Sequence, residues 1–312
     1  MDDHRWYLGG LFDADGCVKI DKGGCLNVSV TQAQKGKEVL YKMQEMFGGS
    51  VLDKAAAKGN RQASFHWILN GHAARQFCVD MASFTYLRRI QLVAASQCPS
   101  RPRKVQIEAT HVDSGETSQY NGIVDAVEAF ARKGIKLHRG HVSDCICGRL
   151  RTTSKCAWKR LDDSGSSKKE ELEVKQALAV DLREAKRRCH EEITTLIPVQ
   201  YAAGFFDGDG CFGLSHRGHR HVVVQKYKPV CTAFQEVFGG YVNHRKTGHY
   251  VWEINKGAAA FVKQIAHYLI GKSKQAEIIL KYDNMGIGLE DARNQIKRLT
   301  GFHHSKAHLK KI

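Results

Sequence analysis

A ten-residue stretch occurs twice in this chain of 312 residues, and it constrains the fold more than any other feature. Residues 7–16 read YLGGLFDADG and residues 201–210 read YAAGFFDGDG, so the aligned Asp15 and Asp209 lie 194 positions apart. In each copy, small residues would let a second backbone approach closely, and an Asp-x-Asp-Gly turn follows. We interpret each stretch as a helix that packs against its twin and delivers two carboxylates at its C-terminal end.

Those carboxylates carry an electrostatic cost. A helix macrodipole favours cations at the C-terminus by about 0.3–1 kcal/mol, so anions there are unfavourable. A single Asp-x-Asp-Gly sequence is usually a solvated turn, but repetition of the whole stretch argues against that interpretation. The repeated cost indicates a positive charge between the two copies, and a divalent cation with oxygen ligands is the natural candidate.

Both stretches resemble the signature of the LAGLIDADG homing endonucleases, in the single-chain form that carries two motifs. In the first half the sequence predicts a helix to residue 12, strands over 17–20 and 26–31, a helix that stops at Gly48, strands over 50–52 and 64–69, and helices over 71–81 and 84–96. The second half repeats this order. An apolar helical run ends at Gly239, and Trp252 corresponds to Trp67.

The resemblance implies an α+β fold of two pseudo-symmetric α-β-β-α-β-β-α half-domains. Their sheets would form a saddle over the DNA major groove, which is wide enough for a β-ribbon. We expect three regions, a first half-domain over 1–98, an insertion with a linker helix over 99–195, and a second half-domain over 196–312 that ends in a basic tail.

The charge balance favours a polyanionic partner. Lys and Arg number 48 against 32 Asp and Glu, which gives a net charge of +16 and a pI near 9.4. Residues 196–312 hold 17 basic and 8 acidic side chains, so we expect the second half to bind phosphates more strongly. The ten cysteines are scattered and no run is long enough to span a membrane. We expect a soluble protein in a reducing compartment, without a membrane partner.

The resemblance also implies which residues carry the chemistry. The last acidic residue of each motif would bind the metal, and these are Asp15 and Asp209, with the backbone carbonyls of Ala14 and Gly208 as further ligands. An oxygen site of this kind suits Mg²⁺ or Mn²⁺. The earlier aspartates of the two motifs, Asp13 and Asp207, are expected to serve the turn.

Two further pairs of catalytic residues follow from the family pattern. A Gln at the end of the second strand corresponds to Gln32 and Gln225. A basic residue on the last helix, near the attacking water, corresponds to Arg88 and Lys272. Arg can clamp a phosphate but does not readily lose a proton, whereas Lys can when it is desolvated. The alternative for both is a solvated helix face.

Polar residues on the solvent side of the strands are candidate DNA contacts. Each taken alone would pass for an ordinary solvated side chain, but together with the duplicated motifs they favour a DNA surface. The first half contributes Lys19, Asn27, Ser29, Gln34 and Arg61, and the second contributes His216, Arg217, Arg220, Lys226, Arg245 and Lys246.

The residues between the halves are too many for a structureless connection. Two strands flanking residues 113–116 predict a hairpin, and apolar residues at helical spacing predict a helix that stops near Gly134 and a second that stops near Gly148, before Trp158. This order resembles the small modular DNA-binding repeats of intron-encoded nucleases. A zinc site is a weaker alternative, because the spacing of the available ligands matches no standard finger: His138, His141, Cys145, Cys147 and Cys156.

The sequence therefore favours a monomeric, metal-dependent endonuclease that makes a staggered break in double-stranded DNA at a long asymmetric site. The competing function is an RNA maturase of the same fold, which binds intron RNA and assists splicing. Retention of both Asp15 and Asp209 favours the nuclease, because splicing has no evident need for paired metal ligands.

Overall fold

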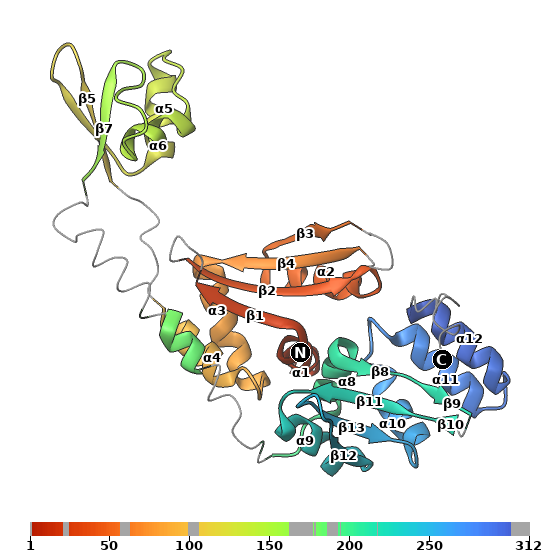
Figure 1. Ribbon diagram of the computed structural model, residues 1–312. Coiled ribbons are helices and arrows are strands. Elements are labelled where there is room, and N and C mark those ends of the chain that lie inside the picture. The colour runs from red at the N-terminus through yellow and green to blue at the C-terminus, as the bar shows by residue number, and fades with distance from the viewer. Residues whose placement is uncertain are drawn as a thin grey trace, which may run out of the picture. The chain divides into compact units, whose positions relative to one another are not determined.

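The computed structural model of the chain describes residues 2–20, 25–56, 63–98, 106–161, 177, 179–185, 193, 195–216 and 218–300. The chain divides into two compact units, one made of Met1–Cys98 with Ala177–Ile312, and one made of Pro99–Gln176 (Figure 1). Residues 177–195, which we had assigned to the insertion, therefore group with the two halves.

The first half follows the predicted order of elements. Its four-stranded antiparallel sheet has the order β1-β2-β4-β3. The elements are α1 (Asp2–Asp15), β1 (Gly16–Ile20), β2 (Leu26–Ala33), η1 (Gln34–Gly36), α2 (Lys37–Phe47), β3 (Ser50–Ala55), β4 (Ser64–Asn70), α3 (Gly71–Met81), η2 (Ala82–Phe84) and α4 (Arg89–Ser96).

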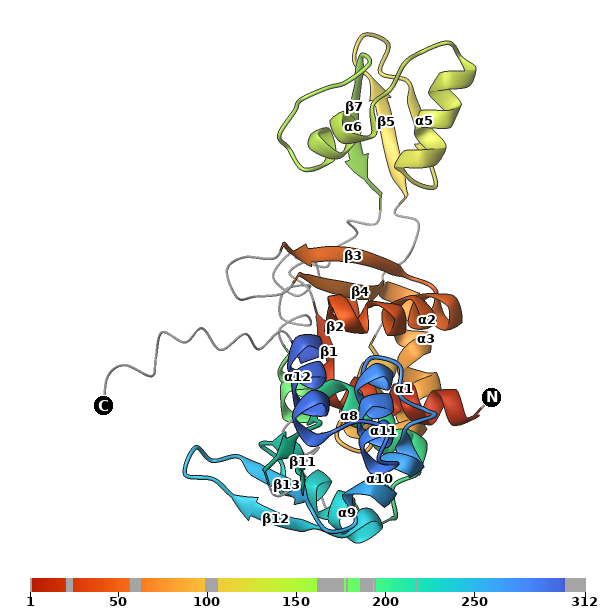
Figure 2. The same ribbon diagram turned by 90° about the vertical axis from the view of Figure 1, so that its right-hand side faces the viewer.

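The second half repeats this plan and adds a final helix (Figure 2). Its main sheet has the order β12-β13-β11-β8, and β9 pairs with β10 separately. The elements are α8 (Val199–Asp209), β8 (Gly210–Cys211), β9 (Leu214–Ser215), β10 (Gly218–His219), β11 (His221–Gln225), α9 (Lys228–Phe238), β12 (Tyr241–His244), β13 (Tyr250–Ile254), α10 (Ala258–Ile265), α11 (Ser273–Asp283) and α12 (Leu289–Thr300).

The duplication includes the way in which α2 and α9 end, just before the second pair of strands in each half. Gly48 and Gly239 end α2 and α9 with φ angles of 73° and 74°, which a side chain would disfavour. The indole N–H of Trp67 donates to the carbonyl of Gly48 at 3.0 Å, and that of Trp252 donates to Gly239 at 2.8 Å. The same helix-to-strand connection is therefore built twice.

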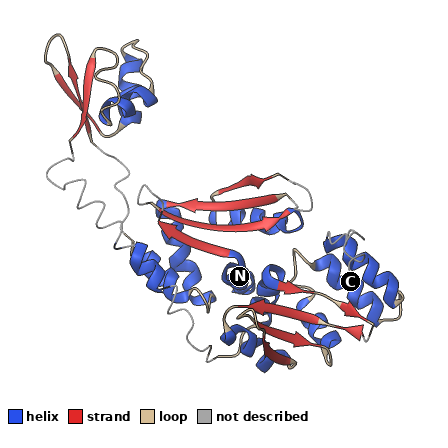
Figure 3. Ribbon diagram, viewed as in Figure 1, coloured by secondary structure: helices blue, strands red, loops and turns tan. Residues whose placement is uncertain are grey.

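Helices α1 and α8 pack against each other between the two sheets (Figure 3). Their glycines allow this contact. A Cβ on Gly10 would lie 2.0 Å from the carbonyl oxygen of Tyr201, and one on Gly204 would lie 1.8 Å from that of Tyr7. The predicted close approach of the two motif helices is confirmed at the backbone.

The motif aspartates lie within these helices. We expected α1 to stop at residue 12 and a turn to carry the acidic residues, but α1 continues to Asp15 and α8 to Asp209. The helical register places Asp13 and Asp15 on different sides of the final turn, because successive helical residues are rotated by about 100°. Each aspartate of a motif can therefore have its own partners.

The middle unit has one strand more than the sequence predicted. Its elements are β5 (Ile107–His111), β6 (Thr117–Tyr120), α5 (Ile123–Arg132), α6 (Arg139–Ile146) and β7 (Cys156–Arg160), with the sheet order β6-β5-β7. The predicted hairpin and helices are present, and Trp158 lies on β7 opposite Ala109. Its ring centroid lies 5.6 Å from that of Phe130, with the two rings tilted by 46°, in a separate small core.

Some predicted segments lie outside the described residues, namely the turn at 22–24, the link at 162–167, the basic tail and most of the charged helix over 168–193. Within that helix, residues 179–185 are helical, and Leu182 and Ala185 are buried. In the described part of the chain, no helix combines the length and apolar character needed to cross a bilayer.

We predict that Gly204→Ala destabilises the large unit by about 2–3 kcal/mol, because the new methyl group would overlap the carbonyl of Tyr7 and push α1 from α8. Thermal and urea denaturation measure the change. Gly288→Ala is the control, since a Cβ there meets no atom within 4 Å. Equal stability of the two variants would contradict the close backbone contact.

Candidate nuclease active site

Asp13 and Asp207 each hold the start of another helix. Oδ2 of Asp13 accepts the backbone N–H groups of Tyr86 and Leu87 at 2.7 and 2.9 Å, and Oδ1 accepts that of Arg88 at 2.9 Å. Asp207 accepts the equivalent backbone N–H groups of Ile270, Gly271 and Lys272 at 2.7, 2.9 and 2.8 Å. Our expectation that these aspartates serve the motif turn is wrong, because they bind the segments that lead into α4 and α11.

These two aspartates also join the motif helices to each other. The hydroxyl of Tyr7 on α1 donates to Asp207 on α8 at 2.6 Å, and the hydroxyl of Tyr201 on α8 donates to Asp13 on α1 at 2.8 Å. Burial raises the pKa of both tyrosines well above its usual range, so both remain donors. The Tyr repeated at the start of each motif is the sequence signal for these reciprocal contacts between the helices.

The second aspartate of each motif meets the predicted glutamine. The amide of Gln32 at the end of β2 donates to Oδ2 of Asp15 at 2.7 Å, and the amide of Gln225 at the end of β11 donates to Oδ2 of Asp209. Strand and helix thus fix each carboxylate. The sequence analysis had named these four residues as candidates without pairing them, and the structure brings them together in two pairs.

Asp15 and Asp209 lie near enough to affect each other's ionisation. Burial, followed by the negative charge of Asp15, raises the pKa of Asp209 to about 7. Burial also raises the pKa of Asp15, while the positive charge of Lys272 opposes the change. A Cβ on Gly208 would lie 2.8 Å from Oδ2 of Asp15, so the small residue in the second motif makes room for this carboxylate.

The basic residues of the two halves occupy equivalent places with different contacts. Nζ of Lys272 donates to the carbonyl oxygens of Phe206, Asp207 and Gly208, and its residue is 6% exposed. In the first half, Nε of Arg88 donates to the carbonyl of Phe12 at 2.9 Å. Both side chains cap the C-terminus of a motif helix, where a cation offsets the dipole. A solvated helix face is excluded for Lys272.

We expected both residues to lie on a helix, but each stands just before one. Arg88 is the N-cap of α4 and Lys272 is the N-cap of α11. An ammonium has three N–H donors, and three carbonyl oxygens accept them here. Lys272 is therefore placed as a fixed cation beside Asp209.

An open cavity of about 310 Å³ adjoins this centre. Ala14, Arg88, Asp209 and Gln225 contribute to its wall, together with Lys226 just after β11. The cavity therefore combines Asp209, one of the two acidic ligand candidates, with basic side chains suited to phosphate.

Most predicted DNA contacts that the structure describes are exposed. The exposed residues are Lys19 on β1, Gln34 on η1, His216 between β9 and β10, Arg220 before β11, Lys226 after β11, and Arg245 and Lys246 in the turn after β12. Gln34 lies on a 3-10 helix and not on a strand. Arg61 and Arg217 lie outside the described residues.

Asn27 and Ser29 do not have the exposed position that we predicted, since each residue is 4% exposed. Strand β2 is central in its sheet, so neighbours flank it on both sides. Asn27 donates to the side chain of Asn70 at 2.7 Å. The alternation of polar and apolar residues along β2 separated Asn27 and Ser29 from its core residues. It could not predict that the neighbouring strands β1 and β4 would cover them.

The centre suits a hard divalent cation in the chemistry of its donors. Two half-buried carboxylates face a common region, and the proximity of Asp15 itself disfavours the charged form of Asp209. Of the two carbonyls predicted as additional ligands, that of Gly208 lies 3.3 Å from Nζ of Lys272, and Ala14 lines the cavity. No cluster of three or more His, Cys, Asp or Glu side chains with metal-binding geometry occurs among the described residues.

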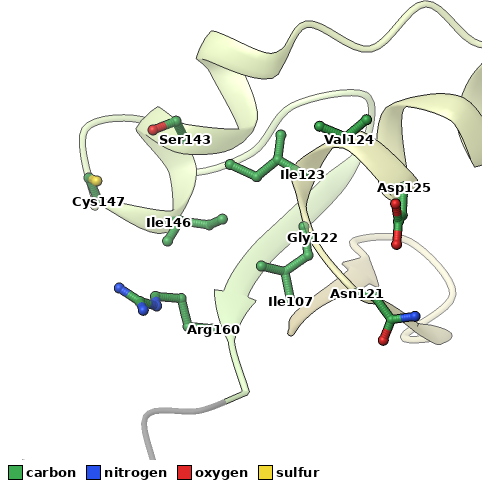
Figure 4. Close-up of a pocket in the computed structure, with 10 residues that line it drawn as sticks. All are labelled: Ile107, Asn121, Gly122, Ile123, Val124, Asp125, Ser143, Ile146, Cys147 and Arg160. Atoms are coloured by element: carbon green, nitrogen blue, oxygen red, sulfur yellow. The ribbon is translucent and has the colours of Figure 1, made fainter. Parts of the chain in front are cut away.

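The middle unit has a larger cavity of about 620 Å³, which no motif residue lines. Figure 4 shows Ile123 of α5 and Ile146 of α6 reaching into it, with Arg160 of β7 at its margin. Of the residues considered for zinc, Cys145 and Cys156 are packed in the core of this unit. Neither this cavity nor these cysteines indicate a catalytic site in the middle unit.

Comparisons with known proteins identify the fold. Residues 2–50 match the model of the LAGLIDADG-like domain. The structure of the I-LtrWI LAGLIDADG homing endonuclease bound to target DNA matches with a TM-score of 0.54 and 16% identity over 96% of each chain. Meganuclease I-SmaMI bound to uncleavable DNA matches with a TM-score of 0.51 and 16% identity over 96% of this chain and 98% of that one. No curated protein matches the sequence.

The chain therefore shares the fold of the I-LtrWI LAGLIDADG homing endonuclease and of meganuclease I-SmaMI, and its residues 2–50 match the LAGLIDADG-like domain. The resemblance read from the two motifs is confirmed, as is the α+β class of the fold.

We predict opposite effects on stability for the two aspartates of the second motif. Because the folded state holds the proton of Asp209 up to a pH of about 7, its contribution to stability is lost as the pH rises through that value. Asp209→Asn should then raise the melting temperature of the metal-free protein at pH 8, with a smaller effect at pH 5. Thermal denaturation in EDTA measures both.

Asp207→Asn is the matched comparison and should lower the melting temperature at both pH values. Its new amide NH₂ would face backbone N–H donors, and an unsatisfied buried donor costs about 1–3 kcal/mol. Similar melting temperatures of the two variants at pH 8 would contradict the division of roles.

Proposed function

We propose that the chain is a site-specific homing endonuclease that cuts both strands of a DNA duplex by metal-dependent hydrolysis and leaves staggered ends. The observation that carries this proposal is the meeting of Asp15 and Asp209 at the junction of α1 and α8, each carboxylate held by a glutamine from a sheet. Carboxylates from two repeats in one centre suit a reaction on two strands.

Asp15 and Asp209 would hold the cation, with Mg²⁺ or Mn²⁺ preferred because all the candidate ligands are oxygens. When bound, such a cation neutralises charge on the scissile phosphate and activates water. Gln32 and Gln225 occupy one oxygen of each carboxylate and orient the other oxygen.

Arg88 and Lys272 supply fixed positive charge beside the carboxylates, and this charge favours their ionised form. Arg88 also lines the cavity together with Lys226, where both are suited to hold the backbone of a substrate. Because the two halves use different basic residues, we expect the two strands to be cut at unequal rates.

A DNA duplex is the substrate that the remaining features favour. The net charge of +16 suits a long polyanion, and exposed basic side chains lie on or beside the strands of both sheets. I-LtrWI and I-SmaMI, which share the fold, are described in complex with DNA. The two halves differ in sequence within one chain, so we propose a monomer that recognises a long asymmetric site.

We predict that Asp15→Asn and Asp209→Asn each abolish double-strand cleavage in Mg²⁺ but change duplex affinity by less than about tenfold, or 1.4 kcal/mol. The carboxylates would serve the reaction, whereas binding is distributed over many phosphate contacts. Cleavage of a target selected from a randomised library, and gel-shift titration with Ca²⁺, measure the two effects.

Wild-type protein in excess EDTA is the control and should bind without cutting. Full cleavage in EDTA would remove the metal from the proposal, and cleavage by either variant would remove that aspartate. Tight binding of structured RNA with no cleavage of any duplex would favour the maturase.

We further propose that the middle unit is an auxiliary DNA-binding module. Its charges are separated along the chain, because residues 106–131 hold five acidic side chains and no Lys or Arg, whereas residues 132–160 hold nine basic side chains and one acidic one. Two of the basic residues are paired within the unit, Arg149 with Asp144 and Lys159 with Glu108. Six others are exposed: Arg132, Lys133, Lys136, Arg139, Arg151 and Lys155.

The attachment points limit where this module can bind. Cys98, which follows α4, is buried, and Ala179, Leu182 and Arg183 line a hollow with Val18 and Gln91. Both ends of the insertion are therefore held by the first half. Only residues 99–105 connect Cys98 to the first described residue of the module. At about 3.5 Å per residue these span no more than about 28 Å, or roughly eight base pairs.

We predict that replacing residues 104–160 with a flexible Gly/Ser linker leaves cleavage intact but weakens binding and makes its salt dependence shallower. The footprint should shorten only on the flank next to the first half, within the reach of the linker. Nuclease footprinting and salt titration measure these effects.

A matched pair of charge variants tests the module without removing it. Lys136→Ala with Arg139→Ala should weaken binding, whereas Asp113→Ala with Glu116→Ala, at the acidic hairpin, should not. An unchanged footprint after the replacement would make the unit a spacer.

A further inference from the structure

One face of the second sheet carries a buried carboxylate that the active site does not use. Trp252 of β13 packs on Phe234 and Phe261 of helices α9 and α10, so the next residue, Glu253, faces the opposite side. Its register partners are Val222 on β11 and Tyr241 on β12. The residue is 8% exposed, and a glutamate is rarely buried to this extent unless it has an ionic partner.

Arg220 covers this carboxylate with one edge of its guanidinium group. Nε donates to Oε1 of Glu253 at 3.0 Å and Nη2 donates to Oε2 at 3.1 Å. Tyr241 adds a hydrogen bond to Oε1 at 2.7 Å. The backbone of Arg220 is also fixed, because its N–H donates to the carbonyl of Gly213 at 2.9 Å.

The other edge of the guanidinium group is left for a ligand. An arginine has five N–H donors, and the contacts with Glu253 use two of them. The remaining three have no acceptor among the residues that the structure describes, and the side chain is 54% exposed. Two of these donors, on Nη1 and Nη2, form a fork that matches O6 and N7 of guanine, the commonest specific contact of Arg in the major groove.

Because of its ionic partner, Arg220 differs in net charge from the residues that are suited to bind phosphate. The charge of Glu253 offsets that of Arg220, so the pair adds little to the general attraction for DNA. A rigid fork with a neutralised charge is suited to reading a base, whereas exposed, flexible cations such as Lys226 and Lys246 are suited to the backbone.

The first half lacks this arrangement at the equivalent positions. The pair Val30 and Trp67 corresponds to Val223 and Trp252, which aligns Asn27 with Arg220 and Ile68 with Glu253. Asn27 is buried and bonded to Asn70, and Ile68 cannot bind a cation. The two sheets therefore present different chemistry at matched positions.

We propose that Arg220 is a specificity-determining residue that reads a guanine in the half-site contacted by the second sheet, and that Glu253 and Tyr241 are positioning residues for it. This inference rests on the proposed DNA-binding function. It requires a preference for guanine at one position of the second half-site. At the pseudo-symmetric position of the first half-site, Asn27 should contribute no preference for guanine.

The test is a binding selection from a randomised duplex library in Ca²⁺, followed by affinity measurements on the selected site and on its three single-base substitutions. Wild-type protein should prefer guanine at the position concerned by about 10- to 100-fold. Arg220→Lys keeps the charge but loses the fork, and should reduce that preference to less than about threefold. Glu253→Gln and Tyr241→Phe should reduce it partly. All other positions should keep their preferences.

Lys226→Ala is the comparison, and it should weaken binding to all four bases equally. The proposal is overturned if Arg220→Lys behaves like Lys226→Ala, which would indicate a phosphate contact, or if Glu253→Gln retains the full preference in a protein with unchanged melting behaviour. Because the readout is binding, selection of a site without cleavage would refute the nuclease and still test Arg220. Failure of wild-type protein to select any duplex would overturn both.

Discussion

The contact between α1 and α8 determines the rest of the structure. Gly10 and Gly204 let the two backbones approach, and the hydroxyls of Tyr7 and Tyr201 cross the interface to buried aspartates of the opposite helix. Those aspartates also accept the N–H groups that precede α4 and α11. One set of interactions therefore joins the two halves, fixes the starts of α4 and α11, and brings the candidate ligands Asp15 and Asp209 together.

The two aspartates of each motif have different roles, the first in stability and the second in the proposed chemistry. Asp13 and Asp207 each accept three backbone N–H groups and a tyrosine hydroxyl, which offset part of the cost of burying them. Burial still raises the pKa of Asp13 above its usual value. Asp15 and Asp209 have one glutamine each and repel one another, and the pKa of Asp209 rises to about 7 as a result of burial and of this repulsion. A site that is unfavourable for two anions in the free protein is suited to a cation, which is a recurrent feature of functional centres.

Pseudo-symmetry is preserved where packing requires it and lost at the positions that we propose to contact the substrate. Trp67 and Trp252 make the same indole hydrogen bond to a glycine carbonyl, because that contact closes each half-domain. Arg88 and Lys272, by contrast, cap the motif helices with different groups, and Asn27 stands where the second half has Arg220. A scaffold of equal halves thus presents unequal surfaces to the two ends of a substrate.

The sequence alone determined the duplication and the order of elements, because these depend on local periodicity and on a motif repeated in the chain. It also indicated the hairpin and helix pair of the middle unit. The resemblance pointed to Gln32 and Gln225, but their hydrogen bonds to Asp15 and Asp209 emerged only from the structure. Only the tertiary structure decided the role of Asp13 and Asp207, the burial of Asn27 and Ser29, and the pairing of Arg220 with Glu253. Each of these depends on groups that are distant in sequence, or on cover from neighbouring strands, and no periodicity within one segment reports either.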